Sequence, residues 1–135
     1  MSSGATLTVE PGVTVKFDSG KVLEVEGTLV ARGTSTSTIT FTSSAASPAA
    51  GDWGYIKFKD SSTDATFDGN GDYSSGSILE HCVAEYGAGS GVGIIWAASS
   101  SPFINNCTVQ YSQANGVSIT PGVAFKFTNN TLTSN

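Results

Sequence analysis

The feature that most constrains the fold is an internal repeat in the second half of the chain. The segment Ile78–Tyr86 aligns with Phe103–Tyr111, and the apolar, cysteine and tyrosine positions of the two segments coincide. A third copy starts at Phe127, and Gly93–Trp96 returns as Gly116–Ile119. A fixed period of about 24 residues, as here, is typical of repeat proteins whose units stack along one axis.

The first half contains more closely spaced similarities of the same kind. Leu7–Glu10 is similar to Leu23–Glu26, and Ile39–Thr42 is similar to Ile56–Lys59. Each segment alternates apolar and polar residues and is bounded by Gly, Asn, Asp or Pro, as short strands are. No helical pattern occurs, so turns must join the strands. Units this small bury an apolar face only by stacking, which predicts an all-β parallel solenoid of about five to six coils.

The amino-acid composition favours β-strands and argues against nucleic-acid binding and a membrane-spanning helix. The 11 Val and 7 Ile outnumber the 5 Leu, and β-branched residues favour pleated strands. Eleven acidic residues against six basic ones give a net charge of −5, which argues against a nucleic-acid partner. No apolar run approaches the ~20 residues of a membrane-spanning helix.

The 135 residues suit one domain. Met1–Gly4 has no signal-peptide character and is interpreted as a vector-derived scar, ahead of a single domain over 5–135 excised from a longer solenoid. The unrepeated stretches Ser43–Asp52 and Asp60–Ser77 are expected to project from the column as loops.

Several segments carry a family resemblance: Leu7–Phe17, Gly27–Thr34, Gly51–Phe58 and Gly76–Gly87. They resemble the right-handed parallel β-helix repeat proteins of the pectin-lyase-like superfamily, especially noncatalytic segments of bacterial surface and secreted proteins. The resemblance implies a right-handed parallel β-helix, an extracellular or cell-surface location, and a structural or display role without enzymatic activity. Two alternatives remain: a carbohydrate-binding module, and a fragment of a polysaccharide lyase or hydrolase whose catalytic coils lie elsewhere.

A carbohydrate-binding surface is the first candidate site. If Ile56 and Phe58 point inward, the alternation of a strand places neighbouring aromatic and basic residues outward. These residues are Trp53, Tyr55, Lys57 and Lys59. We expect them to lie beside the threonines of residues 36–42, and aromatic rings flanked by hydroxyl groups and cations suit a polysaccharide.

A calcium site is the second candidate. Asp68, Asn70 and Asp72 supply three oxygen ligands within one short loop, as the start of a calcium loop does. The positions of Tyr73 and Leu79 exclude an EF-hand. Either a simpler calcium loop or a solvated, turn-rich insertion fits this segment, and otherwise no cofactor is expected.

Other reactive residues are assigned structural roles. His81 aligns with Asn106 and is expected in a turn between two strands, and Arg32 is expected at an exposed turn. Cys82 and Cys107 align in neighbouring coils with inward parity, which favours two buried thiols over a disulfide.

The alignment also predicts contacts. The inward set comprises Ile56, Phe58, Leu79, Ile104, Val109 and Phe127. Aligning Ile56 with Leu79 places Lys57 beside Glu80 on the outer face. Phe125, Phe127 and Leu132 are expected to leave an apolar edge at the end of the column. Such an edge favours self-association, either head to tail in an open stack or as a closed two-fold dimer.

Overall fold

The computed structural model describes residues 1–120 and 125–135, and their regular structure is entirely β. Three strands make one coil, with a strand from each of three sheets. The first coil holds β1 (Thr6–Val9), β2 (Thr14–Phe17) and β3 (Leu23–Val25), and the second holds β4 (Thr28–Arg32), β5 (Ile39–Ser43) and β6 (Ile56–Phe58). The third holds β9 (Ile78–Glu80), β10 (Cys82–Glu85) and β11 (Ile95–Ala97), and the fourth holds β12 (Phe103–Asn105), β13 (Thr108–Gln110) and β14 (Val117–Ile119). β15 (Phe127–Thr128) and β16 (Thr131–Thr133) begin a further coil.

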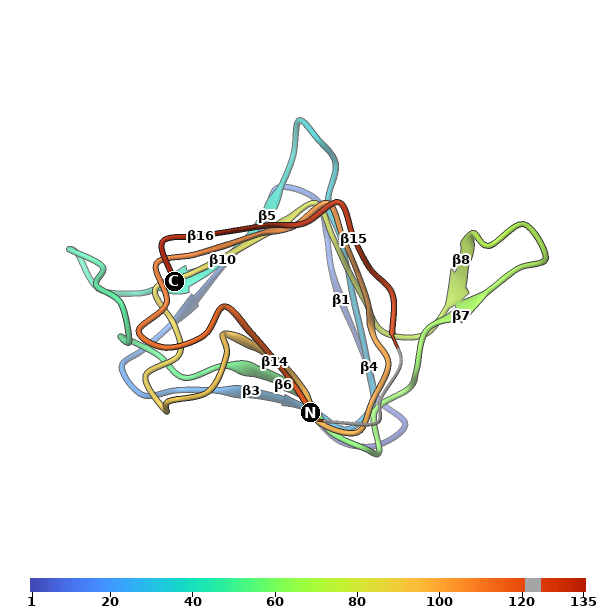
Figure 1. Ribbon diagram of the computed structural model, residues 1–135, viewed down its shortest axis with the longest axis horizontal. Coiled ribbons are helices and arrows are strands. Elements are labelled where there is room, and N and C mark those ends of the chain that lie inside the picture. Colours follow the sequence, from blue (N-terminus) through green and yellow to red (C-terminus); the bar gives the residue numbers. More distant parts are fainter. Residues whose placement is uncertain (121–124) are drawn as a thin grey trace.

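The strands form a three-sided column, whose sides Figure 1 shows end-on. Sheet A has the order β1-β4-β9-β12-β15, sheet B has β16-β13-β10-β5-β2, and sheet C has β14-β11-β6-β3. Every neighbouring pair in these sheets is parallel. The predicted parallel β-helix is therefore confirmed.

The repeat of the second half is confirmed for sheets A and B. As the alignment predicted, Phe103 pairs with Ile78, and Phe127 pairs with Ile104. In sheet C the predicted register was wrong by one position, because Ile95 pairs with Val117 rather than with Ser118.

The similar segments of the first half do not pair with each other. Leu7 pairs with Leu29, and Leu23, on β3, pairs with Ile56 of β6. The segments that look alike in this half are strands on different sides of the column. They share the alternation of apolar and polar residues that every strand of the helix has, so the similarity does not report which strands are neighbours.

The corner between sheets A and B explains His81. His81, Asn106 and Asn129 follow the sheet A strand in successive coils and have φ angles of 49°, 53° and 55°. A single residue in this left-handed conformation turns the chain sharply, and Asn and His adopt it more readily than most residues. The structural assignment of His81 to a turn between two strands is confirmed.

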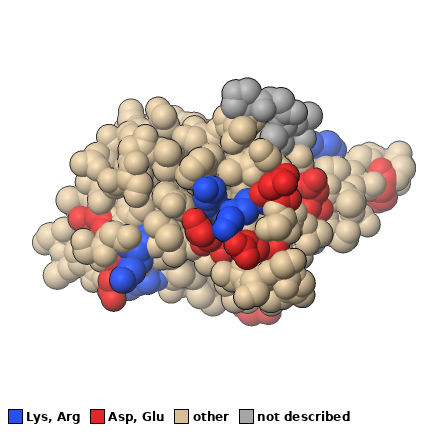
Figure 2. All heavy atoms as spheres, turned by 90° about the horizontal axis from the view of Figure 1, so that it is seen from below, with Lys and Arg blue, Asp and Glu red and all other residues tan. Residues whose placement is uncertain are grey.

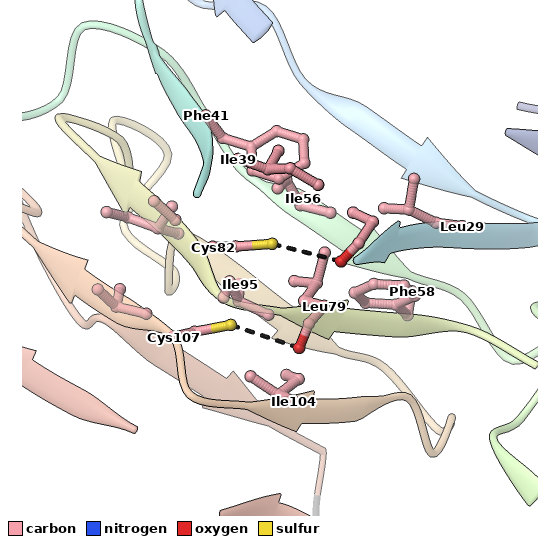
Figure 3. Close-up of a cluster of buried hydrophobic side chains, with 14 of the residues drawn as sticks. Leu29, Ile39, Phe41, Ile56, Phe58, Leu79, Cys82, Ile95, Ile104 and Cys107 are labelled. Atoms are coloured by element: carbon pink, nitrogen blue, oxygen red, sulfur yellow. Dashed lines mark hydrogen bonds between the residues drawn. The ribbon is translucent and has the colours of Figure 1, made fainter. Parts of the chain in front are cut away.

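The core runs along the inside of all three sheets (Figure 3). Five of the six residues predicted to point inward are fully buried: Ile56, Phe58, Leu79, Ile104 and Val109. The sixth, Phe127, is 36% exposed because it lies on the last strand of sheet A, where no described strand covers it.

The two cysteines are buried and form no disulfide with each other, as predicted. Their thiols donate hydrogen bonds to carbonyl groups of the preceding coil, Cys82 to Ala31 O at 3.5 Å and Cys107 to Leu79 O at 3.3 Å (Figure 3). The hydrogen bond with Cys107 and burial both raise the pKa of Cys82. The Cys82 thiol is thus a packing group that stays protonated.

The two segments that were predicted to leave the column do so (Figure 1). One joins β5 to β6. The other joins β6 to β9 and contains an antiparallel hairpin that the sequence did not predict, formed by β7 (Thr66–Phe67) and β8 (Tyr73–Ser75).

We expect Ile104→Ala to lower the free energy of unfolding by about 2–5 kcal/mol, because it removes buried methyl groups and leaves a cavity. Chemical denaturation measures this loss. The control is Thr108→Val, a change on the partly exposed outer side of β13 that keeps a β-branched side chain. A loss for Ile104→Ala no larger than that of the control would contradict its place in the core.

Candidate functional site

The outer side of sheet C carries the residues that most resemble a binding surface. Glu24, Lys57, Trp96 and Ser118 lie side by side in register on β3, β6, β11 and β14. With Tyr55, Glu26 and Lys59 they form what we call the sheet C face. Figure 2 views the molecule from this side and shows basic and acidic groups gathered near its centre.

The aromatic part of the sheet C face consists of Tyr55, which directly precedes β6, and Trp96 on β11, with Lys57 of β6 beside them. The rings of Tyr55 and Trp96 meet edge to face with centroids 5.5 Å apart. The Lys57 ammonium lies 3.9 Å from the centroid of the Trp96 ring. All three side chains are partly exposed. The result is an indole ring held in place by a phenol and a cation, which suits a ligand that presents both an apolar face and polar groups.

The charged part consists of one lysine between two glutamates. Lys59 forms ion pairs with Glu26 and with Glu24, the latter at 3.6 Å. The hydrogen bond to Lys59 and its positive charge lower the pKa of Glu26, and the same contact raises the pKa of Lys59. Lys59 is therefore held by carboxylates, whereas Lys57 lies over the aromatic ring.

One predicted residue is absent from the sheet C face: the placement of Trp53 on the outer surface was wrong. Trp53 is fully buried, stacks on Phe17 with ring centroids 4.2 Å apart, and donates from Nε1 to Glu85 O at 2.8 Å. The strand begins only at Ile56, and alternation does not extend into the loop before it. Tyr55, Lys57 and Lys59 are partly exposed, as the prediction required.

Trp96 is the residue that the sequence analysis missed. It lies inside the Gly93–Trp96 repeat, and its buried neighbours Ile95 and Ala97 show the inward phase of the strand. Reading that alternation would have placed Trp96 outward, beside Lys57.

The predicted neighbours of this surface were also wrong. Thr40 lies on sheet B, paired with Thr14 and Val83, so the strand that carries it does not adjoin the sheet C face. Lys57 is not beside Glu80, because Glu80 lies on sheet A next to Arg32. Both errors arise because strands that follow one another around the column were aligned as if they were neighbours in one sheet.

The comparisons with known proteins bear on the fold that carries this surface. A family model described as "Pectate-lyase like beta helix domain" matches residues 1–77. The chain belongs to this family. Comparison with curated proteins and with solved structures gives no match.

The matched part of this pectate-lyase-like β-helix domain contains the proposed calcium loop, at the tip of the β7–β8 hairpin. Asp68 Oδ1 accepts hydrogen bonds from the backbone N–H groups of Asn70 and Asp72, at 2.9 and 3.0 Å. Lys126 donates to Gly71 O at 2.8 Å. These contacts build a turn. In residues 1–120 and 125–135 no group of three or more His, Cys, Asp or Glu side chains is placed to hold a metal ion.

A second polar feature of the domain is a cleft of about 520 Å³ at the corner of sheets A and B. It brings together the single arginine and the single histidine of the sequence, Arg32 and His81. Arg32 Nε donates to Glu80 Oε2 at 2.8 Å, and its guanidinium lies 5.0 Å from the ring centroid of Tyr73. The Arg32 side chain is 50% exposed, as predicted, but Arg32 is the last residue of β4 and pairs with Glu80 rather than lying in a turn.

The ion pair between Glu26 and Lys59 should make the stability of the fold depend on pH. Because the folded state lowers the pKa of Glu26 below the ordinary value of 4.5, the pair stabilises the fold above that pH and loses its contribution as the pH falls through the lowered value. We expect the melting temperatures of wild type and Glu26→Gln to differ at neutral pH and to converge in acid. The difference should shrink in high salt. A difference that is independent of pH would contradict the ion pair.

Proposed function

We propose that this β-helix is a noncatalytic structural segment of a bacterial cell-surface or secreted protein, and that it displays its loops from a rigid column. The observation that carries the proposal is the continuity of the column. One buried core passes through all the coils, and within the described chain every buried side-chain N and O atom has a hydrogen-bond partner. Such a column is stiff because each coil is fixed by its neighbours.

Polar side chains add to this rigidity on the outside. On sheet B, Glu85 accepts hydrogen bonds from Thr42 at 3.1 Å and from Gln110 at 2.8 Å, which links three successive coils. On sheet A, Glu80 is bonded in the same way to Arg32 and to Asn105. Exposed pairs contribute little singly, but these ladders hold the coils in one register.

The location and partners belong to the same proposal. The family resemblance supports an extracellular or surface setting, and the described chain has no helix that is long and apolar enough to cross a membrane. The strands at both ends of the column leave edges that favour self-association or further coils.

Display can be tested by inserting a short peptide epitope between Asn70 and Gly71, at the tip of the hairpin. We expect the melting temperature to stay unchanged and an antibody to bind the epitope on intact cells that carry the parent protein, because the tip is exposed. The matched control is the same insertion between Ile104 and Asn105, which should unfold the domain. An epitope that is reached only after cell lysis would contradict a surface role.

A second candidate function, polysaccharide binding, is supported by the sheet C face. Trp96, Tyr55 and Lys57 offer a partly exposed ring beside a phenol and a cation, and such groups contact sugar rings and their hydroxyls. The lyase or hydrolase alternative requires catalytic coils outside this chain. An assay for uronate release with this chain alone should therefore be negative.

A glycan array tests the sheet C face. If a polysaccharide binds there, we expect Trp96→Ala to weaken binding about tenfold, equivalent to about 1.4 kcal/mol. Tyr111→Ala, which removes an exposed aromatic residue elsewhere, should leave binding unchanged. Fluorescence of the buried Trp53 checks that both variants fold. Equal binding by wild type and Trp96→Ala would contradict this function.

A further inference from the structure

Two asparagines of the chain, Asn70 and Asn115, are each followed directly by a glycine. In such a pair the side-chain amide can be lost without an enzyme, because glycine has no side chain to hinder attack by its backbone nitrogen. The reaction requires the peptide unit between the two residues to rotate, so that the glycine nitrogen reaches Cγ of the asparagine. The two pairs are the same dipeptide, so their surroundings in the structure decide which of them reacts.

The first pair, Asn70 and Gly71, lies at the tip of the β7–β8 hairpin, which projects from the column (Figure 1). Both residues are exposed. The Gly71 N–H donates to Asp68 O at 3.0 Å, a bond within the turn, and the Asn70 carbonyl accepts no hydrogen bond from the described residues. Lys126 holds only the following peptide unit, through Gly71 O. The unit between Asn70 and Gly71 is thus held by one local bond, and exposed loop tips are the parts of a fold that open most readily.

The second pair, Asn115 and Gly116, is held by the neighbouring coil. The Asn115 carbonyl accepts a hydrogen bond from Ile94 N at 3.2 Å. The Gly116 carbonyl accepts one from Ile95 N, also at 3.2 Å. Ile94, Ile95 and Gly116 are buried. Rotation of the peptide unit after Asn115 would leave the buried N–H of Ile94 without a partner, which is costly, so this pair is locked although the Asn115 side chain is exposed.

We propose that Asn70 is a site of spontaneous deamidation and that the fold protects Asn115. The Gly71 amide nitrogen loses its proton to hydroxide or water and forms a bond to Asn70 Cγ, and the side-chain nitrogen leaves as ammonia. Water then opens the resulting succinimide ring at either of its carbonyl groups, which gives aspartate or isoaspartate. Water is the only co-reactant, and the proposal is independent of the proposed structural role.

The reaction changes the tip of the hairpin. Either product adds a carboxylate to a tip that already carries Asp68 and Asp72. In isoaspartate the backbone also runs through the former side chain, which lengthens it by one carbon atom. Asp68 Oδ1 accepts hydrogen bonds from the N–H groups of residues 70 and 72, at 2.9 and 3.0 Å, and a longer backbone between them no longer fits this spacing. We therefore expect the isoaspartate form to lose the turn.

Peptide mapping by mass spectrometry tests the proposal on the intact folded chain, incubated at neutral and at mildly alkaline pH. The signal is the gain in mass when a side-chain NH₂ group is replaced by OH, and an isoaspartyl methyltransferase identifies the isoaspartate product. We expect residue 70 to be modified about tenfold faster than residue 115, because the tip opens more readily than the column. The rate should rise with pH, since the attacking nitrogen must first lose its proton.

Two comparisons separate the effect of structure from that of sequence. In denaturant the two pairs should react at similar rates, because neither is then held. Asn70→Gln should abolish the reaction at the tip, because glutamine would have to form a larger ring, whereas Asn115→Gln should leave the reaction at Asn70 unchanged. Equal rates at the two sites of the folded chain, or an Asn70 that reacts only in denaturant, would overturn the proposal.

Discussion

The structure depends on the parallel hydrogen bonding that joins each strand to the strands one coil before and one coil after it. This pairing fixes the register, and the register decides which side chains reach the core. It also places chemically similar residues above one another, so Leu29, Ala31 and their partners line one continuous interior. Because every coil depends on its neighbours, the column can carry varied loops and outer faces without losing the fold.

The outer faces follow from the same register. On sheet C the alignment of Glu24, Lys57 and Trp96 sets an anion, a cation and an indole in one row, although they are far apart in sequence. On sheet A it sets Arg32 beside Glu80. Each sheet therefore presents its own set of polar side chains, and the three sides of the domain can bind different partners.

The fold class, the second-half repeat and five of six core residues could be predicted because apolar alternation and period are local properties of the chain. The neighbours of the first-half strands could not. With three strands to a coil, the residue beside Leu7 is Leu29, and the loop that leads from β5 to β6 lengthens the second coil. The candidate site could be predicted to the same extent. The alternation of β6 correctly placed Tyr55 and Lys57 on the outer side, but it was extended to Trp53, which precedes the strand and is buried. Trp96 was not predicted, although the alternation of its own strand points it outward.

Trp53 has a consequence for how the column unfolds. Contacts in a solenoid join nearest neighbours, so coils can melt one after another from an end. Trp53 belongs to the second coil, yet its ring stacks on Phe17 of the first and its Nε1 bonds to Glu85 of the third. One side chain thereby ties three coils together, and the loss of any one of them strips the indole of a partner. Loss of the first or the third coil therefore also removes contacts of the second, and this couples the stability of the three coils.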